Sequence, residues 1–167
     1  VISGIFLLGV AFYLGATNGL SLVGATVVNQ EFYAIALGIF ILTACFKLGA
    51  FPFHAWIADV YSNVTNGNLA TNFFISKIII GFKFITLLQL LLLECDPHFQ
   101  DILIRIVQVI AVMSAFYGNI MALVQGQFKR IIAYSSVAHT GYMLMMICLN
   151  PDEGYEKQLI AYLVVYS

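Results

Sequence analysis

The protein has 167 residues, of which 62% are hydrophobic and only 9% are charged, and its mean hydropathy is +0.96. Soluble domains contain about 45–50% apolar residues, so water is not the main solvent of this chain. The seven Lys and Arg and eight Asp and Glu give a net charge of −1, which favours neither nucleic acid nor an acidic lipid surface as a partner. The continuous apolar runs also exclude a β-barrel, whose strands alternate apolar and polar residues over about ten positions.

Five apolar stretches are predicted to cross a membrane as helices, since a span needs about 20 residues. In chain order they cover about 1–16, 31–47, 69–93, 101–124 and 128–150, and a sixth begins near Gln158. Asp101 is the expected N-cap of the fourth helix. The sequence therefore predicts an all-α membrane protein with a single transmembrane region over residues 1–167.

The two ends of the chain also lead to an expectation. The sequence does not begin with an initiator Met. Its first 14 residues contain neither a basic n-region nor a small-residue cleavage site, so they do not resemble a signal peptide. The chain stops at Ser167, about two turns into the sixth stretch. We expect either that the gene is split or that the ends are disordered or belong to other chains.

The second stretch is expected to break between Lys47 and His54, because Pro52 lacks an amide hydrogen and obstructs the preceding turn. Carbonyl groups that are freed at membrane depth need cover from protein or from a water-filled cavity. A helix can resume from His54 to Tyr61. His54 is a candidate either for binding the freed carbonyl groups or for carrying protons.

Lys47 and Lys77 lie well inside apolar stretches, where a charge costs about 2.5–3.5 kcal/mol on insertion scales. Snorkelling to the interface works only near helix ends, and Lys77 is about eight residues, roughly 12 Å, into its helix. Burial lowers the pKa of a lysine and a nearby carboxylate raises it, so a moving acidic partner can make the amine bind or release a proton. We therefore predict that both lysines face a hydrated path and relay protons.

Lys83 is similarly deep, but its separation of six residues from Lys77 places it about 120° around the same helix. The two lysines therefore cannot share one face. Lys83 either pairs with a carboxylate of another helix or lines a separate wet patch, and no catalytic role is assigned to it.

The fifth stretch carries a polar stripe, because Ser135, His139 and Tyr142 follow i, i+4, i+7 spacing. The stripe is either a proton wire that includes His139 or a set of interhelical hydrogen bonds, each worth about 0.6 kcal/mol in membranes. Lys129 and Arg130 open this stretch after a long uncharged run. By the positive-inside tendency, this basic pair is expected on the inner-compartment side.

No residue pattern in the chain indicates a bound cofactor or metal. The cysteines at 45, 95 and 148 lie about 50 residues apart, without the spacing of metal ligands, and are interpreted as small buried hydrophobes. There is no motif for NADH, flavin, iron–sulfur clusters or quinone. We therefore expect that this chain binds no cofactor.

Two motifs resemble the antiporter-like subunits of respiratory complex I. The first is similar to the broken-helix signature of that family and runs FKLGAFPFHAW over 46–56, followed by ADVY over 58–61. The second resembles a basic pair that leads into a Ser-Ser-x-x-His helix, and runs GNIMAL over 118–123 and FKRIIAYSSVAHTGY over 128–142. Within the family the first motif is most similar to the chain 2 type of subunit, and the resemblance covers about residues 46–142.

The resemblance implies a fold of about fourteen helices with two inverted five-helix repeats, each containing one broken helix. This chain would supply helices six to ten and the start of helix eleven. Lys47 then matches the lysine of the family's first broken helix, and Lys77 matches the connecting lysine on the next helix. The family's glutamate on helix five and lysine on helix twelve have no counterpart here, so other polypeptides must contribute to a complete relay.

The function that the resemblance implies is proton translocation by a membrane-arm subunit of NADH:ubiquinone oxidoreductase that holds no redox centre itself. Its expected partners are the other membrane-arm subunits and lipid, with no nucleic acid, in the mitochondrial inner membrane or a bacterial plasma membrane. One alternative is a subunit of a cation/proton antiporter complex, which sodium dependence of transport would distinguish. Another is a degenerate structural subunit whose lysines only pair with partner acids, which predicts normal pumping after their neutral substitution.

Overall fold

The computed structural model describes residues 2–17, 19, 26–63, 75–147 and 161–162 of the chain. These residues are almost entirely helical, and the predicted all-α fold class is confirmed for them. The helices are α1 (Ile2–Thr17), α2 (Gln30–Leu48), α3 (Ala55–Asn63), α5 (Ile75–Leu93), α6 (Pro97–Val124) and α7 (Phe128–Ile147).

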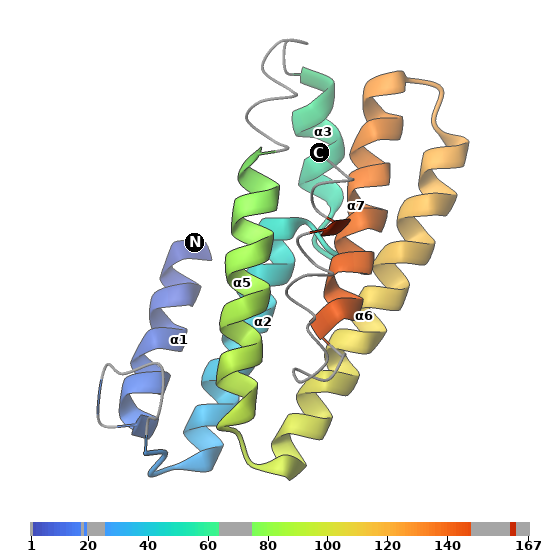
Figure 1. Ribbon diagram of the computed structural model, residues 1–167. Coiled ribbons are helices and arrows are strands. Elements are labelled where there is room, and N and C mark those ends of the chain that lie inside the picture. Colours follow the sequence, from blue (N-terminus) through green and yellow to red (C-terminus); the bar gives the residue numbers. More distant parts are fainter. Residues whose placement is uncertain (1, 18, 20–25, 64–74, 148–160, 163–167) are drawn as a thin grey trace.

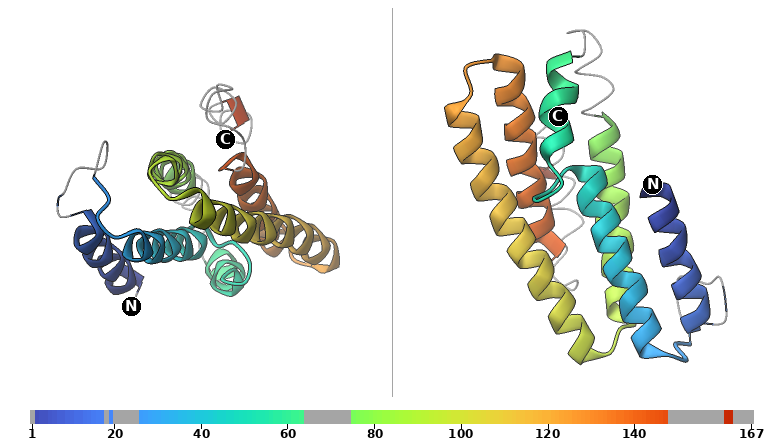
Figure 2. Two further views of the ribbon diagram at one scale, coloured as in Figure 1. Left: turned by 90° about the horizontal axis from the view of Figure 1, so that it is seen from below. Right: turned by 180° about the vertical axis from the view of Figure 1, so that it is seen from behind.

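The helices run roughly along one common direction (Figure 1). Seen along that direction, α2 and α6 lie between α5 and α7 on one side and α3 on the other, with α1 beside α2 (Figure 2). The most extensive packing joins α6 to α7 and α1 to α2. One hydrophobic core runs through α1, α2, α5, α6 and α7, and a smaller cluster joins α3 to α7.

Local sequence signals set both ends of α2. Asn29 is the N-cap, and its Oδ1 accepts hydrogen bonds from the backbone N–H groups of Glu31 (3.1 Å) and Phe32 (3.3 Å). At the other end Gly49 adopts φ 71°, a left-handed conformation that glycine tolerates best. A Cβ at Gly49 would also collide with the side chain of Ile57. Backbone conformation and packing therefore both require glycine at the point where α2 stops.

The chain is not helical between the end of α2 and the start of α3, the segment that contains Pro52. Within this segment the N–H of Phe53 donates to the carbonyl of Ala50 at 2.7 Å, and the peptide bond before Pro52 is cis. The next helix, α3, continues beyond the end of α2 and packs against α7 (Figures 1 and 2). The interruption thus transfers the chain from the packing position of α2 to that of α3.

The starts of α2, α3 and α7 lie within one residue of the sequence prediction, whereas α6 begins at Pro97. The prediction that Asp101 caps this helix is wrong. Proline suits the first helical turn because its missing N–H has no intrahelical partner there, so the helix starts one turn earlier with Asp96 at the capping position. Residues 69–74 of the third predicted span and the start of the sixth at Gln158 lie outside the described residues.

Two described helices, Gln30–Leu48 and Pro97–Val124, are long and apolar enough to cross a membrane by length and composition. Shorter apolar helices cover Ile2–Thr17 and Ile79–Leu93. The arrangement of five spans and the start of a sixth stays a prediction.

Small residues allow α6 and α7 to approach closely. A Cβ added at Gly118 would lie 2.5 Å from the backbone nitrogen of Ala138. A Cβ at Gly141 would lie 2.6 Å from the carbonyl oxygen of Ala111. Both obstacles are backbone atoms, which cannot rotate away as side chains do, so this helix pair depends on glycine at both positions.

We predict that Gly118→Ala and Gly141→Ala each lower the thermal stability of the purified membrane protein, because the added methyl group forces the two helices apart. The expected cost is about 1–3 kcal/mol, as for other overpacked interiors. Gly38→Ala is the matched control, because Gly38 lies inside α2 with nothing within 4 Å of an added Cβ, and alanine there favours the helix by up to about 1 kcal/mol. Equal melting temperatures for all three variants would contradict this account of the α6 and α7 packing.

Candidate functional site

Lys77 of α5 is the only charged side chain that is buried among the described residues, with 8% of its surface exposed. Its Nζ donates hydrogen bonds to the Oγ of Ser136 at 3.0 Å and to the Ser136 carbonyl oxygen at 3.3 Å, both on α7. A buried amine needs such partners because it has lost its hydration. Lys77 is therefore buried inside the bundle, and Ser136 supplies the hydrogen-bond acceptors for its amine.

Ser136 connects three helices at this point. Its Oγ donates to the carbonyl of Ala133 at 2.7 Å within α7 while accepting from Lys77 of α5. The side chain of Tyr61, on α3, also lies close to that of Ser136. Tyr61 is 2% exposed and Ser136 is equally buried. Ser136 is therefore the meeting point of α3, α5 and α7.

Hydroxyl groups of α6 and α7 bind the backbone next to the interruption. The Oγ1 of Thr140 donates to the carbonyl oxygen of Leu48, at the end of α2, at 3.1 Å, and also lies 2.9 Å from the Ser136 carbonyl oxygen. The N–H of Phe51 donates to the Oγ of Ser114, on α6, at 2.9 Å. Backbone groups that leave a helix inside an apolar bundle thus find partners on two other helices, as the physics of buried amides requires.

Lys47 does not share the Ser136 site. It is exposed at the end of α2, and its Nζ lies 5.9 Å from the ring centroid of Phe6 in α1, within range of a cation–π interaction. Among the described residues it forms no ion pair. The structure therefore places the two predicted relay lysines in different environments, with Lys77 enclosed and Lys47 open on one side.

His54 lies in the interruption and packs among aromatic rings. Its ring stacks on Phe51 with centroids 5.7 Å apart and lies 4.4 Å from the ring of Tyr117 on α6. Its Nδ1 is buried without a hydrogen-bond partner among the described residues. Thr140 and Ser114, rather than the His54 side chain, therefore bind the backbone groups next to the break.

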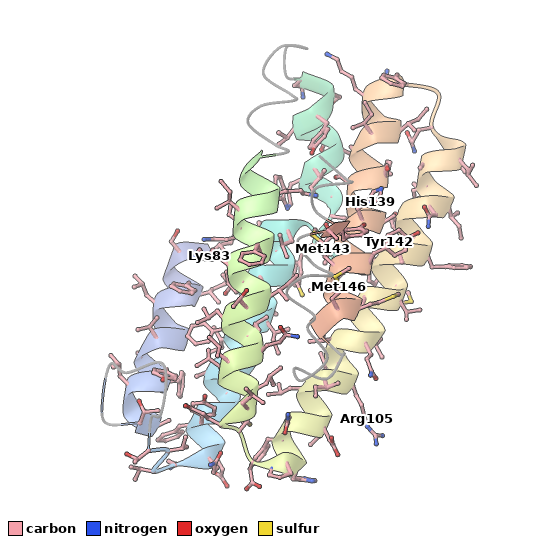
Figure 3. All side chains as sticks on the ribbon, viewed as in Figure 1. Lys83, Arg105, His139, Tyr142, Met143 and Met146 are labelled. Carbon is pink, nitrogen blue, oxygen red and sulfur yellow. The ribbon has the colours of Figure 1, made fainter. Side chains whose placement is uncertain are left out.

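Two of the three residues in the predicted stripe on α7, His139 and Tyr142, form side-chain hydrogen bonds. The Nδ1 of His139 lies 2.5 Å from the hydroxyl oxygen of Tyr162, and its ring is perpendicular to that of Tyr142, with the ring centroids 5.7 Å apart. Figure 3 shows where His139 and Tyr142 lie on α7. Tyr142 accepts a hydrogen bond from the Nδ2 of Asn119 on α6 at 2.7 Å. Ser135 takes no part in the hydrogen bonds described here.

The sequence interpretation missed Ser136 and Thr140, which lie next in sequence to Ser135 and His139. One residue corresponds to about 100° around a helix, so the two polar pairs point in different directions. The i, i+4 spacing of Ser136 and Thr140 could have identified them, because it places both on one face of α7. That face also carries the buried Ala133. That face packs against α3 and α5.

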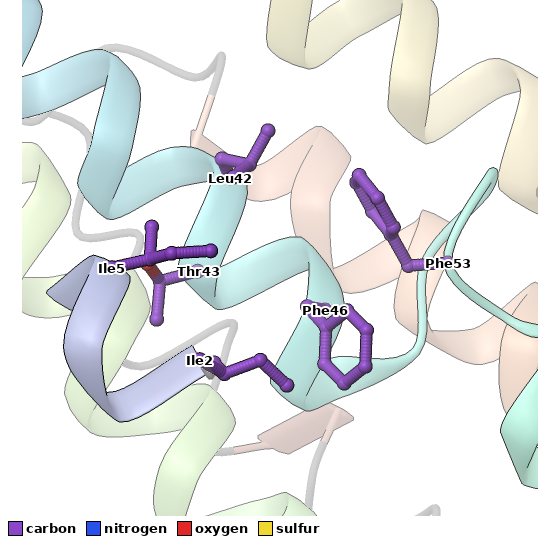
Figure 4. A pocket seen from close by; sticks show the side chains of 6 residues that line it. All are labelled: Ile2, Ile5, Leu42, Thr43, Phe46 and Phe53. Carbon is purple, nitrogen blue, oxygen red and sulfur yellow. The ribbon is translucent and has the colours of Figure 1, made fainter.

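A cavity of about 200 Å³ lies between the start of α1 and the end of α2 (Figure 4). It is lined by Ile2, Ile5, Leu42, Thr43, Phe46 and Phe53. The hydroxyl of Thr43 is already bonded to the carbonyl of Ile39 at 2.8 Å, so the lining offers little to hold water. This cavity suits hydrocarbon and not a proton path. Within the described residues there is also no cluster of His, Cys, Asp or Glu that could hold a metal ion.

A buried lysine beside a point where the backbone leaves an apolar helix is typical of transporter-type membrane proteins. The chain matches, over residues 1–167, the family model described as "NADH:quinone oxidoreductase/Mrp antiporter, TM". The chain belongs to this family, which confirms the resemblance to the antiporter-like subunits.

Curated relatives of the chain are subunits of quinone oxidoreductases. It is 33% identical to NADH-quinone oxidoreductase subunit N 1 of Thermodesulfovibrio yellowstonii, over 99% of this chain and 36% of the relative. It is 35% identical to subunit N of Coxiella burnetii, over 100% and 35%. It is 32% identical to NAD(P)H-quinone oxidoreductase subunit 2 of Gloeobacter violaceus, over 95% and 31%. The chain thus spans about a third of the length of these relatives.

We predict that Thr140→Val destabilises the protein more than Thr86→Val. Both threonines bond the carbonyl four residues earlier in their own helix, but only Thr140 also binds the Leu48 carbonyl at the interruption. The expected difference is about 0.5–1.5 kcal/mol, the usual net value of one hydrogen bond. Denaturant or thermal unfolding of the two variants in the same detergent measures it, and identical stabilities would show that Thr140 does not support the break.

Proposed function

We propose that the chain is part of a proton-translocating membrane-arm subunit of NADH-quinone oxidoreductase. The observation that carries this proposal is Lys77, an amine that is buried among helices and, within the part of the chain that the structure describes, is bonded only to neutral oxygen atoms. A titratable group is rarely retained in such a place without a function. The names of the relatives supply the complex in which such a subunit works.

The subunit type that fits best is the one called subunit N or subunit 2 among the relatives. The similarity of residues 46–61 to the chain 2 type of the mitochondrial enzyme supports the same assignment. The relatives named above are bacterial or cyanobacterial, and the membrane of the proposed subunit is a bacterial plasma membrane or the mitochondrial inner membrane.

We further propose that α2 and α3 are the two halves of one broken transmembrane helix, and that this helix belongs to one of two inverted repeats. The end of α2 at Gly49 and the hydroxyl groups of Thr140 and Ser114 support this interpretation. The remaining helices of the fold would come from other segments or polypeptides. In the complete unit, this chain contributes five spans and the start of a sixth.

In the proposed relay, Lys47 exchanges protons with Lys77 through water, and Lys77 passes them toward His139. Lys77 is held by Ser136, which lies three residues before His139 on the same helix. Among the described residues the buried Nδ1 of His54, beside the break, has no hydrogen-bond partner, so it can accept a proton or a hydrogen bond from water. An acidic residue outside the described chain is required next to Lys47 to stabilise its charge.

The charges at the two ends of the bundle support one orientation. Glu31 and Asp96 lie at the same end of the bundle, where α2 and α6 begin. The two helix starts are adjacent there, because the N–H of Asp96 donates to the side chain of Gln30, the residue before Glu31. Lys129 and Arg130 lie at the opposite end, where α7 begins. Basic residues favour the inner compartment, so the loop between α6 and α7 faces that side.

The chemistry of electron transfer is assigned to other subunits, because no motif for NADH, flavin, iron–sulfur clusters or quinone is present in this sequence. The chain would contribute to catalysis by coupling proton movement to a reaction elsewhere in the complex. Its partners are the neighbouring membrane-arm subunits and lipid.

We predict that Lys77→Met reduces proton translocation per assembled complex at least tenfold, because it removes the titratable amine while keeping an apolar chain of similar length. Lys83→Met is the matched control, since it removes a lysine six residues away on the same helix that lies on a different face. The measurement is acidification by reconstituted vesicles during NADH oxidation, divided by the amount of complex present. Full pumping by the assembled Lys77→Met complex would contradict the relay and favour a structural role.

The second candidate is a subunit of a cation/proton antiporter, which the description of the matching family also includes. The same vesicles separate the two functions. A requirement for sodium, with no dependence on NADH, would favour the antiporter, whereas NADH-driven transport without sodium supports the respiratory subunit.

A further inference from the structure

One carbonyl group at the interruption lacks a backbone donor for a reason that the sequence sets. It belongs to Leu48, the last residue of α2, and in a continued helix it would accept the N–H of residue 52. Residue 52 is proline, which has no N–H. Leu48 is 1% exposed, and a buried carbonyl without a donor is costly. The hydroxyl of Thr140, at 3.1 Å, supplies the hydrogen bond that this oxygen needs.

Thr140 has two acceptors for a single hydrogen. Its Oγ1 lies 3.1 Å from the Leu48 carbonyl oxygen and 2.9 Å from the Ser136 carbonyl oxygen. A hydroxyl group carries one hydrogen, so it donates a full bond to only one of these oxygens at a time. Thr140 is 0% exposed, so bulk water does not compete for it. Rotation about the Cβ–Oγ1 bond exchanges the two hydrogen bonds without moving a heavier atom.

The Ser136 carbonyl oxygen brings Lys77 into this choice. A carbonyl oxygen has two lone pairs, and inside α7 one of them accepts the N–H of Thr140. The Nζ of Lys77, at 3.3 Å, and the Thr140 hydroxyl compete for the other. A charged amine is the stronger donor, since charge-assisted hydrogen bonds are roughly twice as strong as neutral ones. While the Lys77 amine is bound to Ser136, the Thr140 hydrogen is therefore directed to Leu48.

We propose that Thr140 is a positioning residue that couples the Lys77 amine to the interruption between α2 and α3. With the amine on the Ser136 carbonyl, Thr140 holds the end of α2 at Leu48. When the amine leaves that carbonyl, Thr140 turns to Ser136 and the Leu48 carbonyl loses its donor. This exchange of hydrogen bonds does not require proton transport, whereas its use in transport rests on the function proposed above. In that use, movement of Lys77 away from Ser136 loosens the break.

Hydrogen–deuterium exchange in the intact membrane complex tests the coupling. The observable is the exchange rate at the end of α2, where the N–H groups of Gly49 and Ala50 bond back to that helix. Thr140→Val and Lys77→Met should each raise this rate about twofold to tenfold, as expected for the loss of one net hydrogen bond to the Leu48 carbonyl. In the double variant, Thr140→Val should add less than about twofold to Lys77→Met, because Thr140 has already left Leu48.

Two control variants separate the coupling from general loosening of the bundle. Thr140→Ser keeps the hydroxyl group and should exchange within about twofold of the original protein. Thr86→Val removes a hydroxyl group that bonds within α5, to the Phe82 carbonyl at 2.9 Å, and should leave the rate at the end of α2 unchanged. If the Lys77→Met complex does not assemble, Lys77→Ala provides a second background without the amine.

The proposal is overturned if Thr140→Val raises the exchange rate by the same factor with and without the Lys77 amine. It is also overturned if removal of the amine leaves the rate at the end of α2 unchanged. Full proton pumping by the Lys77→Met complex would contradict the proposed function alone, because the exchange measurement does not depend on transport.

Discussion

The burial of the Lys77 amine inside an apolar bundle is the constraint on which the rest of the site depends. An amine at that depth has no bulk water, so the protein must supply acceptors. Ser136 supplies both its hydroxyl and its carbonyl oxygen, at 3.0 and 3.3 Å. Because Ser136 also contacts Tyr61 of α3, the helix after the interruption is tied to the same point.

The interruption between α2 and α3 imposes a second requirement of the same kind. Leaving the helix frees a carbonyl at Leu48 and an N–H at Phe51, and hydroxyl groups of Thr140 and Ser114 bind them. Those hydroxyls reach the backbone because α6 and α7 pack closely through Gly118 and Gly141. The close packing at the two glycines, the two hydroxyl groups and the interruption between α2 and α3 therefore depend on one another.

The sequence predicted the helices well, because long apolar runs bounded by turn residues leave few alternatives. It also predicted correctly that Lys77 and Lys83 face different directions, since that follows from helix periodicity alone: Lys77 is buried and Lys83 is exposed. The start of α6 was misplaced because Asp101 is a good capping residue and Pro97 is a good first-turn residue, and local preference does not rank them.

The hydrogen-bond partners of the site could not be predicted from one sequence. Ser135 and Ser136 are chemically identical, and only packing decides which of them meets α5. The surroundings of Lys47 are a different case, because no acidic partner of its amine is found among the described residues and the expected one stays a prediction. Family membership came from two motifs and is confirmed over the whole chain, while the roles of individual residues stay predictions.

The most direct test of the central claim is a map of the intact membrane complex at a resolution that shows ordered water. We predict that the Nζ of Lys77 lies within hydrogen-bonding distance of Ser136, and that ordered water molecules connect it to Lys47 on one side and to His139 on the other. A Lys77 side chain enclosed by apolar groups and Ser136 alone, with no water leading to either residue, would contradict the claim that it relays protons.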